Sequence, residues 1–115
     1  MLKLEIGFDE ERILRDGKYD LDAMYKYLDK LFIHQGLQKD CTTDKSVFYK
    51  GTGKNTDMAA IFSCVFHLEK KDWFIEYVNL WLLYDNENTT DEENYEIEDI
   101  LIQSRKKLAN LGKAV

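Results

Sequence analysis

The N-terminal residues alternate strictly between apolar and polar side chains. This period of two predicts a half-buried strand over residues 2–8. The side chains expected on its core face are Leu2, Leu4, Ile6 and Phe8. Asp9 and the two glutamates after it are typical of a helix start, so a short helical turn is expected to run through Leu14.

Residues 20–36 carry a helical pattern with signals at both ends. The apolar residues that recur at helical spacing are Leu21, Met24, Leu28, Leu31 and Phe32. Asp20 can cap the first turn, because its carboxylate accepts hydrogen bonds from free backbone N–H groups. Gly36 stands where a left-handed residue commonly ends a helix, and Leu37 fits the apolar contact of a Schellman ending.

The middle of the chain predicts two strands joined by a connection that contains glycine. Residues 46–50 are the first short strand, and residues 51–56 are a candidate hairpin loop. Residues 60–68 alternate and are rich in β-branched and aromatic side chains, which favours the second strand. A helix is the alternative for this segment, because residues 56–60 would start a helix well.

Residues 72–84 hold both tryptophans and are predicted to form a central helix. Asp72 is a suitable N-cap. The apolar residues that follow helical spacing are Trp73, Phe74, Tyr77, Val78, Trp81 and Leu82. Strand alternation fails here, because an apolar run would place side chains on both faces of a pleat. Such a helix is either enclosed by protein or uses a flank made of Leu80, Leu83 and Tyr84 as half-buried dimer contacts.

The C-terminal part of the chain predicts one more helix, over residues 95–111. Its apolar and small positions follow a spacing of three and four residues at Ile97, Leu101, Ser104, Leu108 and Leu111. Gly112 is a plausible C-cap. The order β-α-β-β-α-α predicts an α+β fold for a single domain over residues 1–115. Its two layers would be an antiparallel sheet of about three strands and helices that cover one face of that sheet.

The charge is concentrated in one segment. The 115 residues carry a net charge of −6. The acidic residues between positions 85 and 99, with no lysine or arginine among them, are Asp85, Glu87, Asp91, Glu92, Glu93, Glu96, Glu98 and Asp99. This strip is either a solvated connection with helix-capping charges, or a docking strip in which Asp91, Glu92 and Glu93 attract a basic partner or mimic nucleic acid.

The composition argues against a membrane protein and against a secreted one. No apolar run approaches the ~20 residues that a membrane span needs, and the N-terminus lacks the apolar stretch of a secretory signal. Cys41 and Cys64 show no metal-ligand spacing, so no cofactor is expected. Because there is no secretory signal, the thiols are expected to be reduced in the cytoplasm. Direct nucleic-acid binding is not expected, because the basic run at residues 105–107 is small.

Two groups of residues are candidates for a catalytic or phosphate-binding site. Residues 51–56 superficially resemble a phosphate-binding loop, but the glycine spacing differs and Asn55 follows Lys54. His34, His67 and Cys64 could serve a small enzyme. If residues 60–68 form a strand, however, Cys64 and His67 point to opposite faces and cannot act as nucleophile and base.

Three short pieces of sequence look familiar together. They are Asp72-Trp73-Phe74 with Val78 and Trp81-Leu82, Ile97-Glu98-Asp99 with Leu101, and Gly7-Phe8 ahead of Lys18-Tyr19-Asp20. The chain thereby resembles an uncharacterised family of short acidic cytosolic proteins from Gram-positive bacteria. The resemblance implies a bacterial accessory protein and transfers no activity to any residue.

Three functional hypotheses follow from the sequence. The first is a non-enzymatic protein-interaction domain, in which an apolar surface or the acidic strip binds a protein partner or a second copy. The second is an acidic inhibitor that mimics nucleic acid and occupies a DNA- or RNA-binding protein. The third is a small enzyme whose site lacks a recognisable motif.

Overall fold

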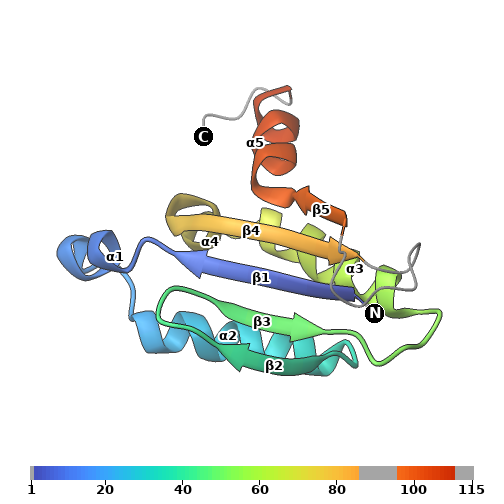
Figure 1. Cartoon of the computed structure of the whole chain (residues 1–115). Coiled ribbons are helices and arrows are strands. Elements are labelled where there is room, and N and C mark those ends of the chain that lie inside the picture. The colour runs from blue at the N-terminus through green and yellow to red at the C-terminus, as the bar shows by residue number, and fades with distance from the viewer. Residues whose placement is uncertain (1, 86–95, 111–115) are drawn as a thin grey trace.

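The structure is a computed structural model and describes residues 2–85 and 96–110. Along the chain, its elements are β1 (Leu2–Phe8), α1 (Glu10–Asp16), α2 (Leu21–His34), β2 (Gln38–Thr42), β3 (Val47–Lys50), α3 (Asp57–Glu69), α4 (Asp72–Tyr77), β4 (Val78–Asp85), β5 (Glu96–Asp99) and α5 (Ile100–Asn110) (Figure 1). The α+β class agrees with the prediction from the sequence.

The sheet has five strands in the order β2-β3-β1-β4-β5, and each neighbouring pair is antiparallel. The prediction of about three strands is therefore wrong. Helices α2, α3 and α4 lie behind the sheet in Figure 1 and cover one of its faces. Among residues 2–85 and 96–110, no helix covers the other face of the sheet.

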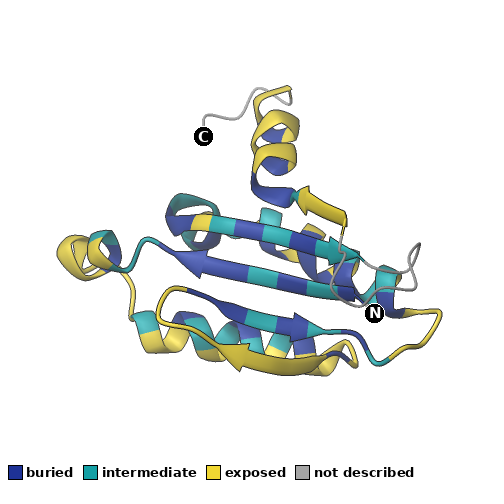
Figure 2. Ribbon diagram, viewed as in Figure 1, coloured by how far each residue is buried: buried dark blue, intermediate teal, exposed yellow. Residues whose placement is uncertain are grey.

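Strand β1 forms where the alternation of its residues predicted a half-buried strand, but it lies at the centre of the sheet and not at the expected edge. Its core-facing side chains are all buried: Leu2, Leu4, Ile6 and Phe8. The register places Leu4 between Tyr49 of β3 and Leu83 of β4. Figure 2 shows the resulting alternation of buried and half-buried residues along the central strands.

Helix α2 forms where its pattern predicted, with the expected signals at both ends. The Asp20 carboxylate accepts a hydrogen bond from the backbone N–H of Asp22 at 3.3 Å. Gly36 has a φ of 86°, and the N–H of Leu37 donates to the carbonyl oxygen of Phe32 at 3.0 Å. This Schellman ending buries the Leu37 side chain against the core.

The predicted strand over residues 60–68 is wrong, because this segment belongs to helix α3. The side chains of α3 that enter the core lie at helical spacing: Ile61, Cys64, Val65 and Leu68. The alternation that favoured a strand also included Phe66, which is exposed. Residues 51–56 consequently connect a strand to a helix and are not a hairpin loop.

The predicted helix over residues 72–84 ends at Tyr77, and the remainder is strand β4. Val78 already has extended backbone angles, with φ −67° and ψ 128°. β4 pairs with β1 along its length, and β5 pairs with its second half, so backbone groups of β4 find ladder partners in the sheet. This pairing outweighs the helical pattern of the side chains. The apolar run hid the strand because apolar side chains occupy both faces of β4.

The C-terminal helix begins five residues later than predicted, at Ile100. Residues 96–99 instead form β5, which pairs with β4 and places Asp99 opposite Leu82. The residues of α5 that face the core include Leu101, Ser104 and Leu108. Leu111 and Gly112 lie outside the described residues. Within the described part of the chain, no helix combines the length and the apolar character needed to cross a bilayer.

Candidate functional site

The side of the sheet that faces away from α2, α3 and α4 is here called the open face. The register of β1, β3 and β4 places alternate side chains on it: Lys3, Glu5, Phe48, Lys50, Leu80, Leu82 and Tyr84. β5 adds Ile97, which stands opposite Tyr84 and is 58% exposed. The open face therefore combines aromatic and aliphatic side chains with a few charged ones.

A carboxylate at the centre of the open face is held by two hydroxyl groups. The Tyr84 hydroxyl donates to Oε1 of Glu5 at 2.7 Å, and the Ser46 hydroxyl donates to Oε2 at 2.6 Å. Burial and the hydrogen bond to Glu5 together raise the pKa of Tyr84 to about 12. Both oxygens of Glu5 already accept strong hydrogen bonds. A partner that covers Glu5 and displaces its water therefore need not supply new donors for every lost hydrogen bond.

Two lysines on the open face share one aspartate. Asp40 on β2 lies 3.4 Å from Nζ of Lys3 and 3.7 Å from Nζ of Lys50. All three side chains are partly shielded from solvent, with between a quarter and a third of each exposed. Lys3 and Lys50 therefore each form an ion pair with Asp40 on the sheet.

The apolar part of the open face surrounds these polar groups. The rings of Phe48 and Tyr84 approach each other across β1, with their centroids 6.0 Å apart. Leu80 and Leu82 are half-buried beside them. Contiguous apolar side chains of this kind mark interaction surfaces when they lie at a protein surface.

Among the contact residues considered from the sequence, Leu80 and Tyr84 lie on the open face, on a strand rather than on a helix flank. Leu83 points to the opposite side and is 1% exposed, so it is a core residue and cannot be a half-buried contact. The proposed acidic contacts fall outside the described residues: Asp91, Glu92 and Glu93.

The cysteine and histidines that could have served an enzyme do not form a common site. Cys64 is buried, and burial raises the pKa of its thiol to about 12, so the reactive thiolate is disfavoured. His67 lies one turn later on α3 and hydrogen-bonds the Tyr27 hydroxyl at 2.5 Å. His34 is exposed at the end of α2.

The glycine-containing loop at residues 51–56 is closed by an internal carboxylate. Asp57 is buried and accepts hydrogen bonds from the backbone N–H groups of Gly53 at 2.8 Å and Lys54 at 3.1 Å. The Thr52 hydroxyl donates to its other oxygen at 3.2 Å. A bound phosphate would need these same donors, and the Asp57 carboxylate already uses them.

Burial alone would raise the pKa of Asp57, but the hydrogen bonds from Thr52, Gly53 and Lys54 outweigh it and lower the pKa. Gly51 also approaches this carboxylate so closely that a Cβ atom would collide with it. Asp57 therefore stays ionised and determines the shape of the loop. The sequence offered a signal for this role, since aspartate in the first turn of a helix is a common partner of free N–H groups.

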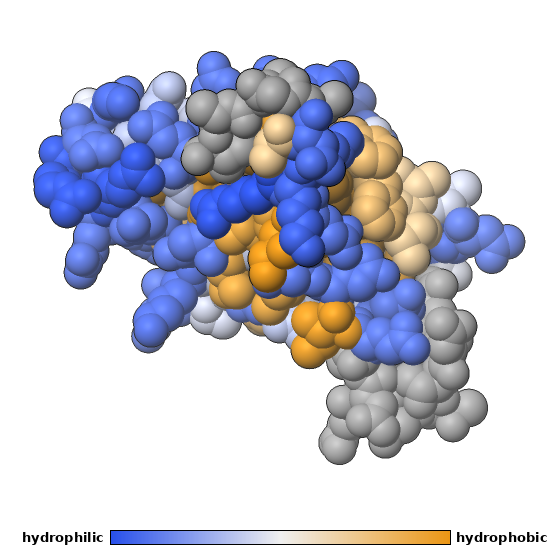
Figure 3. All heavy atoms as spheres, turned by 90° about the horizontal axis from the view of Figure 1, so that it is seen from above, coloured by the Kyte–Doolittle hydropathy of each residue, from blue (hydrophilic) through white to orange (hydrophobic). Residues whose placement is uncertain are grey.

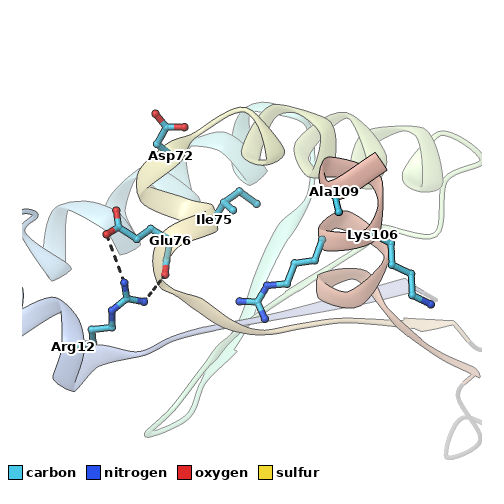
Figure 4. Close-up of a pocket in the computed structure, with 7 residues that line it drawn as sticks. Arg12, Asp72, Ile75, Glu76, Lys106 and Ala109 are labelled. Carbon is cyan, nitrogen blue, oxygen red and sulfur yellow. Dashed lines mark hydrogen bonds and ion pairs between the residues drawn. The ribbon is translucent and has the colours of Figure 1, made fainter. Parts of the chain in front are cut away.

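A cleft of about 900 Å³ opens between α1, α4 and α5 (Figure 4). Arg12 reaches across from α1, donates from Nη1 to the backbone oxygen of Glu76 at 2.9 Å, and lies 4.9 Å from the centroid of the Tyr77 ring. Arg105 donates to the carbonyl oxygen of Val78 at 3.4 Å. Arg12 thus joins α1 to α4, and Arg105 joins α5 to β4, at the walls of this cleft. Seen from above, apolar areas of the surface lie between hydrophilic side chains (Figure 3).

No family model, no curated protein and no solved structure matches this chain.

Proposed function

We propose that this chain is a non-enzymatic protein-interaction domain that pairs with a second copy of itself through the open face of the sheet. A single observation carries this proposal. One face of a five-stranded sheet lies under helices, and the other displays half-buried apolar side chains around polar groups that already bind one another.

The charges of the open face favour a second copy as the partner. On β1, β2 and β3, the positive side chains Lys3 and Lys50 are balanced by Glu5 and Asp40. The whole chain carries a net charge of −6, so two copies repel each other overall, chiefly through the acidic residues between positions 85 and 99. The part of the open face on these three strands is thus neutral, whereas Asp99 of β5, opposite Leu82, adds one negative charge near its edge. Two copies can approach over the neutral part with least repulsion.

The hydrogen bonds within the open face reduce the cost of covering it. Burying a charged or polar group is costly unless it keeps its hydrogen-bond partners. Glu5 keeps those from Tyr84 and Ser46, and Asp40 keeps its lysines. The contact can then gain from the apolar side chains, chiefly Phe48 and those on β4 and β5.

Light scattering over a wide range of protein concentrations tests this proposal with two matched variants. Ile97→Lys places a charge on the open face, and Ile33→Lys places the same charge on α2. Both isoleucines are 58% exposed, so the two variants differ mainly in the surface that they change. Circular dichroism should show that both variants remain folded.

The wild-type chain should approach twice its mass of 13.6 kDa as its concentration rises. Ile97→Lys should remain monomeric, while Ile33→Lys should dimerise like the wild type. A wild-type chain that stays monomeric throughout, or equal weakening by both substitutions, would contradict pairing through the open face.

The proposal includes a cytoplasmic location and a role as a bacterial accessory protein, in line with the family resemblance. Exposed Cys41 and buried Cys64 are both free thiols, which suits a reducing compartment. Mimicry of nucleic acid is the alternative partner class. It depends on Asp91, Glu92 and Glu93, and no contact among the described residues favours it.

A further inference from the structure

A small aromatic pocket lies on the helix layer, between α2 and α4 and on elements that do not form the open face. Its volume is about 200 Å³. The residues that line it are Tyr19, Asp20, Ala23, Met24, Tyr27 and Trp73. A water molecule occupies about 30 Å³, so the pocket has room for a group of several heavy atoms.

Two walls of the pocket are aromatic rings at nearly a right angle. The centroids of Tyr27 and Trp73 are 5.2 Å apart, and their planes meet at 86°. The Tyr27 hydroxyl shares a hydrogen bond with Nε2 of His67, and the two rings stack with an interplanar angle of 17°. His67 thereby fixes the orientation of the Tyr27 wall.

The other aromatic walls are also held by neighbours. Trp73 packs against Phe8 and Phe74, with ring centroids 6.4 Å and 6.0 Å away. Tyr19 rests edge-on against Tyr77 at 5.9 Å, yet 41% of it stays exposed. The pocket is therefore formed before any ligand arrives, which limits the entropy lost on binding.

The electrostatics of the pocket favour a cation. The faces of tyrosine and tryptophan rings attract positive groups within about 6 Å. Nζ of Lys71 lies 6.0 Å from the centroid of the Tyr27 ring, and its positive charge opposes a second cation there, so the Asp20 carboxylate has to offset this repulsion. Asp20 adds an exposed carboxylate to the lining of the pocket.

We propose that this pocket binds the cationic head of an arginine or lysine side chain that a partner protein presents. The aromatic walls would contact the face of a guanidinium or the methylene groups next to an ammonium, and the Asp20 carboxylate would pair with the charge. This site is independent of the proposed dimer, because its residues lie on α2, α4 and the segment that precedes α2.

Nuclear magnetic resonance of the two indole N–H groups tests the pocket directly. Trp73 lines the pocket, while Trp81 is buried in the core and serves as an internal control. The probes are acetyl-arginine amide, its neutral isostere acetyl-citrulline amide, and tetramethylammonium. Two variants accompany the titration. Trp73→Leu removes one aromatic wall, and Asp20→Asn removes the charge while keeping a residue that can cap α2.

Acetyl-arginine amide should shift the Trp73 indole signal in a saturable way and leave Trp81 unchanged, whereas the citrulline probe should have no effect. Each variant should weaken binding by about fivefold or more. The proposal is overturned if the arginine and citrulline probes act alike, or if both variants bind as the wild type does. It is equally overturned if tetramethylammonium binds and the arginine probe does not, because the pocket would then serve a free quaternary ammonium.

Discussion

Ile6 of β1 stands directly opposite Trp81 of β4, and both side chains are completely buried under the helix layer. Trp81 also meets the ring of Phe74 edge to face, with centroids 4.8 Å apart. The chain thus turns back on itself at the junction of α4 and β4. A residue from the short helix packs on the strand that follows it, and this contact ties the helix layer to the sheet.

Replacing Trp81 with alanine should strongly destabilise the fold. Removing a fully buried aromatic side chain loses its transfer free energy and leaves a cavity, for a loss of ~3–5 kcal/mol in unfolding free energy. Urea denaturation followed by circular dichroism measures this loss. Trp73→Ala provides the comparison, because Trp73 is only partly buried and its loss should be smaller. A loss under ~1 kcal/mol for Trp81→Ala would contradict its place in the core.

Replacing Asp57 with asparagine should weaken the loop between β3 and α3. Asparagine keeps the size of the side chain but cannot offer two charged oxygens to Thr52, Gly53 and Lys54, so a loss of about 1–3 kcal/mol at neutral pH is expected. Urea titrations at neutral pH measure the difference. An unchanged unfolding free energy would show that Asp57 does not hold the loop.

The same substitution should change the acid limb of the stability curve. The folded pKa of Asp57 lies below the ordinary value of 3.8, so its contribution is present above pH 3.8 and is lost as the pH falls through the folded pKa. The wild type should therefore lose stability faster than Asp57→Asn below pH 3.8. Parallel curves for the two proteins would show that folding does not lower the pKa of the Asp57 carboxylate.

Tyr84→Phe should lower the unfolding free energy at neutral pH and make it fall less steeply as the pH rises above 10. The variant loses the hydrogen bond to Glu5, for about 1 kcal/mol at neutral pH. In the wild type, folding raises the pKa of Tyr84 from 10.0 to about 12, so its contribution is present below pH 10 and disappears between pH 10 and pH 12. Unfolding measured across this range should show a shallower slope for the variant, and an identical slope would refute the assignment.

The elements that the sequence predicted well are those whose pattern has one explanation. In β1, apolar residues alternate because only one face lies under the helices. In α2, Asp20 and Gly36 mark the ends and the apolar residues between them share one side. Local rules and burial agree in both elements, so the pattern of side chains was sufficient.

The other elements depend on contacts that are distant in sequence. β4 places Leu80 and Leu82 on the open face and Trp81 and Leu83 in the core, so its continuous apolar run resembles a buried helix. No residue of β2 (Gln38–Thr42) is buried, and pairing with β3 rather than burial makes it a strand. Periodicity cannot reveal either case.

The candidate surface was only partly foreseeable. Leu80 and Tyr84 were considered as contact residues, but Phe48 and Ile97 were not, because the register that brings them together joins three separate parts of the chain. The role of Asp57 was missed for another reason. Because the following segment was predicted to be a strand, residues 51–56 were predicted to be a hairpin loop. A hairpin gives no reason to expect the Asp57 carboxylate as the acceptor for the N–H groups of the loop.

The most direct test of pairing through the open face is methyl-resolved nuclear magnetic resonance of the wild-type chain in a dilution series. The methyl signals of Leu80, Leu82 and Ile97 should shift together with one common midpoint, because a second copy covers them at high concentration. Those of Leu14 and Ile33, exposed on α1 and α2, should stay constant. Constant signals from the open face, or equal shifts from the helix layer, would contradict the account.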